Sequence, residues 1–345
     1  MRILLIGNFA PPYEEESLHN LSLLKKLEED GHECSVLNTS DKPSSYKNFI
    51  DSSSYVDFVF KLLRSCWKKD IVHFSTKGYL RLGLLKLMTS IAVGKCFFAK
   101  TFITIHSELF SVAGQMRSPV GGRQTLFTSF TLADKIICCD KDTYDVASMY
   151  MKKTNFELIP SFLYTPREIT ESDSSTLKKL GTKESAIVFA NVTYPSFLFD
   201  ILKELLSNYP LRSDTAIVIS LSDKPTSKLQ HVLEEMGSKM QDQIVFIEPD
   251  DVRSALMAYS KAEIVLRPMS CDGISFFKNF AISVKKLKHV GDYIYFPSGL
   301  LFIKEGSAAE MCVCIMNTML CVEAGTPAEL SMENAYERIL QLYGE

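Results

Sequence analysis

Short runs of β-branched and other apolar residues alternate with longer amphipathic segments, and this alternation constrains the fold more than any other feature. Segments of helical length separate the runs, and one of them carries leucines on a single face before Gly31. Runs that are apolar throughout are typical of the buried strands of parallel βαβ units. In the first half we expect strands at 2–6, 33–37, 71–74, 101–105, 135–138 and 156–159.

The alternation breaks once and then starts again. The stretch TPREITESDSSTLKKLGTK, from Thr165, combines Pro, Ser and charge and offers little to bury, so we expect a linker over 167–183. A second series follows, with strands at 185–190, 216–220, 244–247 and 263–266 and helices at 197–207, 224–239 and 252–260. A last helix, opened by Ser331 as N-cap, lies within 331–345 and could pack back on the first domain. The pattern predicts two α/β domains, over 1–166 and 184–330.

Size and composition narrow the class of protein. A chain of 345 residues fits two domains, and its net charge of −3 gives no general attraction for nucleic acid. No uncharged apolar run is long enough to span a bilayer, and the first run is too short for a signal peptide. The nine cysteines form no CxxC pair and the six histidines do not cluster with them, so we expect core thiols, a cytoplasmic location and no metal.

Two Rossmann-like domains would bind ligands beyond the carboxyl ends of their strands. A nicotinamide-dependent oxidoreductase would need a Gly-x-Gly-x-x-Gly turn after the first strand. The sequence there is GNFAPP, from Gly7 to Pro12, which lacks that turn and excludes this class.

Several segments resemble, in order, those of the GT-B glycosyltransferases that build bacterial surface polysaccharides, the large retaining family of the group 1 type. The opening MRILLIGNFAPPY, the helix with His19 and the turn GHECSVL are similar to the start of that family. Later matches are DIVHFST (70–76), FITIHSE (102–108), ADKIICCDKDTYD (133–145) and IPSFLYTP (159–166). The segment AEIVLRPMSCDGISF (262–276) resembles the donor site. The resemblance covers most of the chain and implies an acceptor-side domain and a nucleotide-sugar domain facing each other across a cleft.

The resemblance assigns donor-binding residues to the second domain. The loop 268–273 and a helix starting near Ile274, with Gly273 and Ser275, would offer backbone N–H groups to a diphosphate. Arg267 would contact phosphate or sugar, and Asp272 matches the first acid of a Glu-x7-Glu motif that contacts the transferred sugar. The alternatives are an Arg267 paired with a carboxylate and an Asp272 that caps the helix.

On the acceptor side the resemblance places His106 near the reacting sugar, where it could bind a hydroxyl or assist proton transfer. Gly7, Asn8 and His19 would border the acceptor. A structural role is the alternative for His106, a surface or packing role is the alternative for His19, and His73 is expected in the core.

Three departures from the family favour a second hypothesis. Phe280 stands at the second acidic position, and NVTYPSFLFD (191–200) has no cation before Lys203. The acids Glu14 to Glu16 replace a glycine pair, although exposed glutamates also suit the start of a helix. Lys278, Lys285 and Lys286 are expected on the solvated face of a helix. The second hypothesis is therefore a diverged, weakly active or inactive member that binds a partner or a glycan.

A basic stretch without acids lies between Asp70 and Glu108. Lys77, Arg81 and Lys86 are predicted to contact an anionic membrane, which would suit a lipid-linked acceptor at the inner face of the membrane. The alternative is a Rossmann helix whose lysines extend over apolar packing. No aromatic-interleaved basic groove suggests nucleic acid, and the resemblance implies neither a cofactor nor a metal.

Overall fold

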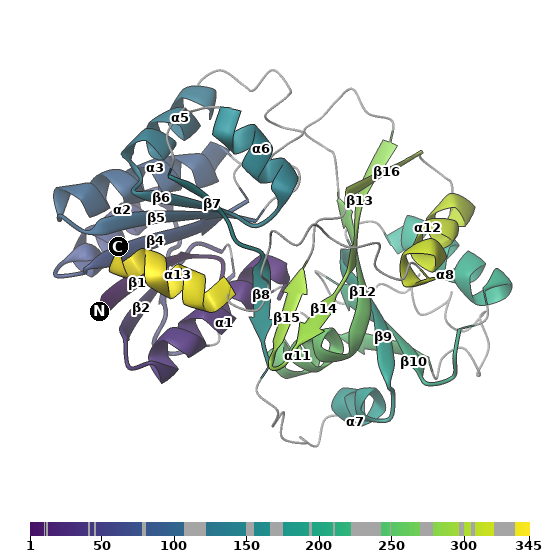
Figure 1. The fold of residues 1–345 in the computed structure, drawn as a ribbon. Coiled ribbons are helices and arrows are strands. Elements are labelled where there is room, and N and C mark those ends of the chain that lie inside the picture. The colour runs from purple at the N-terminus through teal and green to yellow at the C-terminus, as the bar shows by residue number, and fades with distance from the viewer. Residues whose placement is uncertain are drawn as a thin grey trace. The chain divides into compact units, whose positions relative to one another are not determined.

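The computed structural model divides the chain into two compact units (Figure 1). Unit 1 comprises Met1–Tyr164 and Pro327–Glu345, and unit 2 comprises Thr165–Thr326. The structure describes residues 1–9, 11, 13–40, 42–44, 46–77, 81–106, 122–149, 155–165, 175–192, 195–209, 211–221, 243–248, 250–269, 279–296, 300–304, 308–320 and 335–345.

Unit 1 is built on a seven-stranded sheet in the order β3-β2-β1-β4-β5-β6-β7, in which every pair is parallel. This is the strand order of a doubly wound Rossmann sheet. Successive strands are added toward one edge up to β3 and toward the other edge from β4 on, so the order reverses between β1 and β4. The strands are β1 Arg2–Gly7, β2 Glu33–Asn38, β3 Ile50–Asp51, β4 Ile71–Thr76, β5 Lys100–Ile105, β6 Lys135–Cys138 and β7 Phe156–Leu158. A short strand, β8 Ser161–Tyr164, follows them.

Helices cover both faces of this sheet, as Figure 1 shows. One face carries α2 Tyr55–Cys66, α3 Arg81–Cys96 and α5 Gly122–Leu132. Their inner side chains, such as Phe58, Leu87 and Phe130, share one apolar core with the strands. The other face carries α1 Glu15–Glu29 and α13 Ala335–Gly344, and α6 Lys141–Met149 packs beside β6 and β7. Local sequence accounts for the ends of two of these helices. Ser54 caps the start of α2, where its side chain accepts from the Asp57 N–H at 3.2 Å. Gly31, with a φ of +79°, follows the end of α1.

The last helix, α13, belongs to unit 1 although unit 2 precedes it in the sequence. Its Tyr343 is fully buried, hydrogen-bonds to the Nδ1 atom of His73 and packs edge-on against Phe102, with ring centroids 4.9 Å apart. Tyr336 donates to Asp30 at 2.6 Å, and Arg338 pairs with Glu157 at 2.8 Å. The chain therefore completes its first unit with its last residues.

Unit 2 has a six-stranded sheet in the order β11-β10-β9-β12-β13-β16. The strands β9 Ser185–Val192, β10 Thr215–Leu221, β11 Ile244–Ile247 and β12 Ala262–Met269 are parallel, whereas β13 Asn279–Lys286 and β16 Leu300–Lys304 are antiparallel to their neighbours. A hairpin of β14 Lys288–Val290 and β15 Tyr293–Phe296 lies between them in sequence. The helices are α7 Ser175–Gly181, α8 Pro195–Asn208, α11 Val252–Lys261 and α12 Ala308–Leu320.

The predicted α/β class with two Rossmann-like units is confirmed, and each of the ten expected strands is present within two residues of its expected start. The structure differs at the expected linker, where α7 belongs to unit 2 and buries Leu177 and Leu180. Those two leucines, three residues apart, are sufficient for a short amphipathic helix. The expected helix at 224–239 and the N-cap Ser331 lie outside the described residues.

The helix expected to start near Ile274 does not continue past residue 278, because β13 begins at Asn279. Phe280, Lys285 and Lys286 therefore lie on a strand and not on a helix. The sequence NFAISVKK explains the correction, since Phe280, Ile282 and Val284 alternate with smaller or polar residues.

Candidate functional site

The carboxyl edge of the unit 1 sheet gathers the polar side chains that follow its strands. Asn8 follows β1, Thr76 ends β4, His106 follows β5 and Asp140 follows β6. The strands are in register at this edge, with Thr76 opposite Ile105 and Ile105 opposite Cys138. In a doubly wound sheet this edge, near the point where the strand order reverses, is where ligands bind.

Gly7 allows α1 to approach the end of β1 closely. A Cβ atom at Gly7 would lie 3.0 Å from Asn20 Nδ2 and 3.0 Å from Ser75 Cβ. Asn20 uses this closeness, because its Nδ2 donates to the carbonyl oxygen of Asn8 at 3.0 Å and its Oδ1 accepts from Ser75 Oγ at 2.7 Å. The loop after β1 is thereby tied to both α1 and β4.

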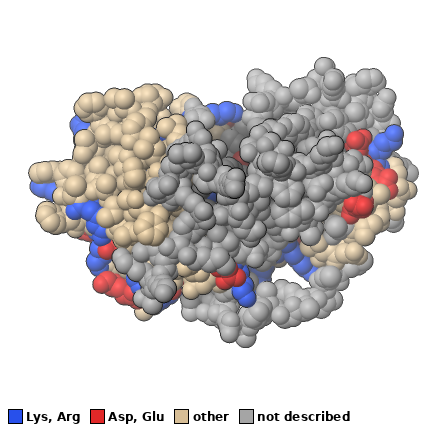
Figure 2. Space-filling view, turned by 90° about the horizontal axis from the view of Figure 1, so that it is seen from above, with Lys and Arg blue, Asp and Glu red and all other residues tan. Residues whose placement is uncertain are grey.

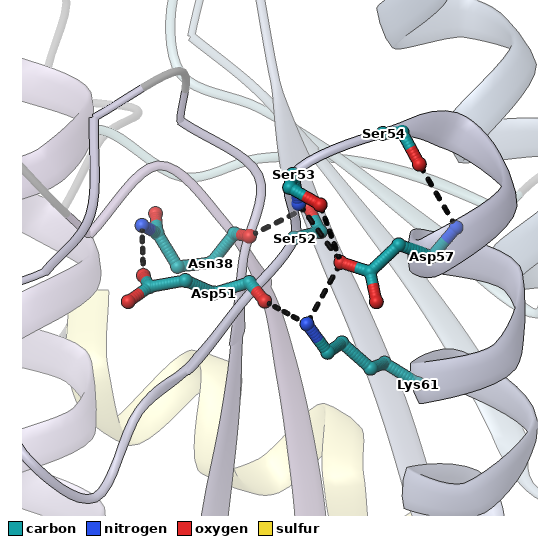
Figure 3. A network of polar contacts seen from close by, with 7 residues as sticks. All are labelled: Asn38, Asp51, Ser52, Ser53, Ser54, Asp57 and Lys61. Atoms are coloured by element: carbon teal, nitrogen blue, oxygen red, sulfur yellow. Dashed lines mark hydrogen bonds and ion pairs between the residues drawn. The ribbon is translucent and has the colours of Figure 1, made fainter.

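A second polar network holds the other side of that loop (Figure 3). The Asn38 side chain at the end of β2 accepts from the Phe9 N–H at 3.1 Å and donates to Asp51 Oδ1 at 2.7 Å. Lys61 of α2 donates to the Asp51 carbonyl at 2.7 Å and pairs with Asp57 at 2.7 Å. The backbone from Gly7 to Phe9 is thus fixed before any ligand binds, which reduces the ordering cost of binding.

The acids at the start of α1 are not the exposed helix-start glutamates considered above. Glu14 and Glu16 are both buried, and Glu14 pairs with Lys77 at 3.1 Å. The Glu14 N–H also donates to Ser17 Oγ at 2.7 Å, as in a capping box. Carboxylates in this place accept hydrogen bonds from hydroxyl groups and disfavour a second anion such as phosphate.

His19 and His106, both predicted on the acceptor side, lie against each other. Their ring centroids are 4.8 Å apart at 61°, and His19 also packs edge-on against Phe162 at 4.7 Å. His106 Nδ1 lies 3.0 Å from Ser161 Oγ and 3.4 Å from Cys139 Sγ. The structure therefore brings two sequence-predicted residues into one buried pair, and the surface position considered for His19 is wrong.

Burial keeps the His19 ring and the nearby Cys139 thiol uncharged. Desolvation lowers the pKa of His19 to about 4, and its Nδ1 accepts from the Phe162 N–H at 3.1 Å, as only the neutral ring can. Because Nδ1 is the acceptor, the proton sits on Nε2, which has no hydrogen-bond partner among the described residues. Burial also raises the pKa of Cys139 well above its usual value, so this thiol is not a nucleophile. His19 Nε2–H is a buried donor that a ligand oxygen could satisfy.

His73, expected in the core, is buried there. Its Nε2 lies 2.6 Å from Thr104 Oγ1, and its other ring nitrogen bonds to Tyr343. Both ring nitrogens of His73 therefore have partners within the protein. Through its bond to Tyr343, His73 helps to hold α13 on the sheet.

Of the three cations predicted to meet a membrane, Lys86 is buried and Lys77 is ion-paired in this structure. Lys86 is only 8% exposed, and its Nζ donates to the Thr39 carbonyl at 3.3 Å and lies over the Phe58 ring. Lys77 is paired with Glu14, and the side chain of Arg81 lies outside the described residues. The correction has a simple cause, because position 86 faces the sheet and its long side chain reaches a backbone carbonyl through apolar packing.

In unit 2 the structure describes only part of the predicted donor site. Arg267 lies on β12, paired in register with Ser283 of β13, while its side chain is outside the described residues. Asp272, Gly273, Ile274 and Ser275 also lie outside them. The strand β12 extends to Met269, so the loop that was expected to begin at Pro268 begins later.

Two features that sequence reasoning did not assign bear on the site or its surroundings. Asn20 fixes the loop after β1 and Ser161 contacts the His106 ring. In the sequence Asn20 stands out only as the neighbour of His19, and Ser161 only as part of IPSFLYTP. Among the residues that the structure describes, no group of three or more His, Cys, Asp or Glu side chains is placed to hold a metal ion.

No protein-family profile matches the sequence, and no curated protein matches it significantly. Solved structures with a similar course of the chain include S. aureus MnaA with UDP (17% identity, TM-score 0.48, covering 78% of this chain and 74% of that one). Others are Anabaena HepE with UDP and glucose (10%, 0.46, 77% and 73%) and an alpha-glucosyltransferase with UDP (14%, 0.42, 77% and 72%). Because these TM-scores are below 0.5, the fold assignment rests on the two sheets of this chain.

Proposed function

We propose that this chain is a glycosyltransferase that moves a sugar from a nucleotide-sugar donor to a glycan or lipid-linked acceptor in surface polysaccharide synthesis. The observation that carries the proposal is the buried pair of His19 and His106 at the carboxyl edge of the unit 1 sheet. The loop Gly7–Phe9, fixed by Asn20 and Asn38, lies at the same edge. The ordered resemblance to GT-B glycosyltransferases implies the acceptor side at this edge.

The chemistry of this edge suits sugar hydroxyl groups. His19 is neutral and offers an Nε2–H donor, and the carboxylate of Glu14 can accept. His106 would hydrogen-bond a hydroxyl of the reacting sugar or take the acceptor's proton, and Asn8 would border the acceptor. Such contacts would hold and orient an uncharged acceptor, and the proposed reaction needs no metal or cofactor.

The donor would bind to unit 2. Arg267 would meet its diphosphate, Asp272 the transferred sugar, and the backbone around Gly273, Ile274 and Ser275 the phosphate oxygens. The resemblance implies transfer with retention of the anomeric configuration, which NMR of the product would establish. The reaction would take place in the cytoplasm, at the inner face of the membrane if the acceptor is lipid-linked.

A second candidate function is binding without transfer. The strand β13 places Phe280 and Lys286 where the family would have a donor-binding helix, and β9 is followed by α8 with no cation before Lys203. Losing two charge-assisted contacts of about 1.5–3 kcal/mol each would weaken donor binding by a factor of roughly 100 or more. A diverged member of this kind would serve as a glycan-binding or scaffold protein.

Calorimetry with UDP, GDP, ADP and CMP, and with their sugar conjugates, separates the two functions. A transferase should bind one nucleotide with a dissociation constant at or below the millimolar range. Absence of heat with every nucleotide at millimolar concentration would leave only the binding protein.

The His106→Gln variant tests the site within unit 1. Once a donor and an acceptor are found, we expect the variant to lower kcat by about 10²- to 10⁴-fold while it still unfolds cooperatively in urea. The matched control is His289→Gln, on the exposed part of β14 in unit 2. Equal turnover of the His106 variant and the control would remove His106 from the site.

A further inference from the structure

The helices α2, α3 and α5 lie side by side on one face of the unit 1 sheet (Figure 1). Their large exposed side chains are mostly apolar, and Arg64, Thr128 and Thr131 are exposed beside them. On α2 and its C-cap the exposed residues follow a helical spacing of four, three and four positions. On α3 the same periodicity continues, and α5 adds two more large side chains. The exposed apolar residues of this α2–α3–α5 surface are Val56, Phe60, Leu63, Trp67, Leu82, Leu85, Ala92, Cys96, Phe127 and Leu132.

The charges on this surface are almost all of one sign. The sequences of α3 and α5 contain no acid, and the one acid of α2, Asp57, is paired with Lys61 at 2.7 Å. Arg64 and Lys68 are exposed beside Trp67, whereas Lys95 at the end of α3 is paired with Asp134 at 2.5 Å. In the space-filling view the described part of unit 1 shows a broad area without charged atoms, with Lys and Arg as well as some Asp and Glu along its outer margin (Figure 2).

The ends of α2 and α3 add aromatic rings at one corner of the surface. Trp67, at the end of α2, is 65% exposed, and its ring centroid lies 6.1 Å from that of Phe97 after α3. The next residue, Phe98, is 97% exposed and has a φ of +58°. A bulky side chain is disfavoured in the left-handed region, and full exposure gives it no packing in return. The positive φ of Phe98 therefore costs stability that no packing within the chain offsets, which points to a contact outside the chain.

We propose that the α2–α3–α5 surface docks on an anionic lipid bilayer. Its apolar residues would enter the boundary between headgroups and acyl chains, Trp67 and Phe98 would lie at headgroup level, and Arg64 and Lys68 would meet lipid phosphates. The surface differs from the one predicted from the sequence, because it uses the outward side of α3 and not Lys86. The proposal does not depend on the sugar chemistry and holds for a binding protein as well.

Charge favours a bilayer over a second copy of the chain. An isologous contact would use the same surface of both copies, whose described acids Asp57 and Asp134 are already paired with Lys61 and Lys95. Arg64 and Lys68 of both copies would then enter the contact without an acidic partner. That arrangement is repulsive, whereas an anionic lipid surface attracts each of these cations.

The chain contains a single tryptophan, and Trp67 on this surface makes the test direct. The full-length protein is titrated with vesicles of phosphatidylcholine, alone or mixed with phosphatidylglycerol, while the emission of Trp67 and co-sedimentation are followed. We expect a blue shift and sedimentation with the mixed vesicles, less of both with phosphatidylcholine alone, and quenching by lipids brominated in the acyl chain. Added salt should weaken the binding.

Three variants define which residues carry the binding. Arg64→Glu with Lys68→Glu should lower the partition coefficient by about 30-fold or more, since each cation contributes about 1 kcal/mol. Lys203→Glu with Arg253→Glu, at exposed positions of unit 2, changes the net charge equally and should leave binding unchanged. Phe98→Gly should weaken binding while keeping or raising Tm, because glycine tolerates the positive φ.

Other results would overturn the proposal. An emission spectrum of Trp67 that neither type of vesicle changes would exclude docking on lipid, and equal losses in the two charge-reversal variants would show a general charge effect. A dimer that forms without lipid and shields Trp67 from iodide would identify the surface as an interface between copies of the chain.

Discussion

At the scale of single residues, several polar groups lie where their own chemistry alone would not place them. His19, His73, Glu14 and Lys86 are all buried, and each has a specific partner in unit 1. Burying such groups is costly unless they are hydrogen-bonded or neutral. The two histidines take the neutral form, and this gives unit 1 a dependence on pH.

Burial lowers the pKa of His73 to about 3 and that of His19 to about 4, whereas an unfolded histidine has a value of about 6.5. Between these values the unfolded chain binds protons that the folded chain does not. The free energy of unfolding is therefore highest above about pH 6.5 and falls as the pH is lowered toward 4, by about 1.4 kcal/mol per pH unit for each histidine. Urea unfolding of unit 1 can be followed through Trp67.

The variant His73→Gln isolates one of these contributions, because glutamine does not titrate. Its stability should be lower than that of the wild type at pH 7.5, but the slope between pH 6.5 and 4.5 should be shallower by about 1.4 kcal/mol per pH unit. The exposed His289→Gln is the control and should leave the slope unchanged. Parallel pH profiles for all three proteins would mean that His73 titrates alike in the folded and unfolded states.

At the scale of elements, the approach of α3 to its sheet depends on Gly94. A Cβ atom there would lie 2.8 Å from Thr101 Cγ2 and 3.3 Å from Val72 Cβ. Thr101 cannot easily turn away, because Asp134 accepts from its N–H at 2.7 Å and from its hydroxyl at 3.1 Å. A Cβ atom at Gly94 would therefore clash with the Thr101 side chain, which its hydrogen bond to Asp134 holds in place.

Two opposing effects decide the sign of Gly94→Ala. Alanine favours a helix over glycine by about 1 kcal/mol, and overpacking a core costs about 1–3 kcal/mol. Because Thr101 is held in place, we expect a net loss of about 1–2 kcal/mol in urea unfolding monitored at Trp67. Gly344→Ala on α13, where a Cβ atom would meet nothing within 4 Å, is the control and should not destabilise unit 1. A Gly94→Ala protein as stable as the wild type would show that α3 shifts freely on the sheet.

At the scale of the whole molecule, unit 1 is discontinuous in sequence. Its helix α13 buries Tyr336, Ile339, Leu342 and Tyr343 against the sheet. At about 1.5–3 kcal/mol for each buried side chain, this helix contributes roughly 6–12 kcal/mol, which is comparable to the whole stability of a domain.

A fragment of residues 1–164 should therefore lack cooperative unfolding and should expose its apolar sheet face, as tested by urea titration and dye binding. The same fragment joined to residues 327–345 by a flexible Gly/Ser linker should unfold cooperatively, with Trp67 as the probe. If the shorter fragment unfolds with the same midpoint as the joined one, α13 is dispensable.

Local sequence was sufficient for the elements of both parallel sheets. Strands such as β6 and β11 are continuous apolar runs with β-branched residues, and helices such as α11 have a clear apolar face, so neighbours in sequence determine them. Local sequence also placed His106 at the carboxyl end of a strand, because the apolar run of β5 ends just before this residue. The strands β13 to β16 were not anticipated, because a helix was expected from Ile274 and the alternation of β13 and the two-residue turn between β14 and β15 were not used.

Local periodicity is sufficient to predict the parallel βαβ architecture and the polar residues that follow its strands. Which of those residues meet depends on how the elements pack. His19 lies on α1 and His106 after β5, and nothing in their spacing brings their rings together. Likewise, Lys86 is buried and Arg64 is exposed because of the side on which each helix packs against the sheet. The helix α13 belongs to unit 1 because His73 and Phe102 provide the surface on which it is buried.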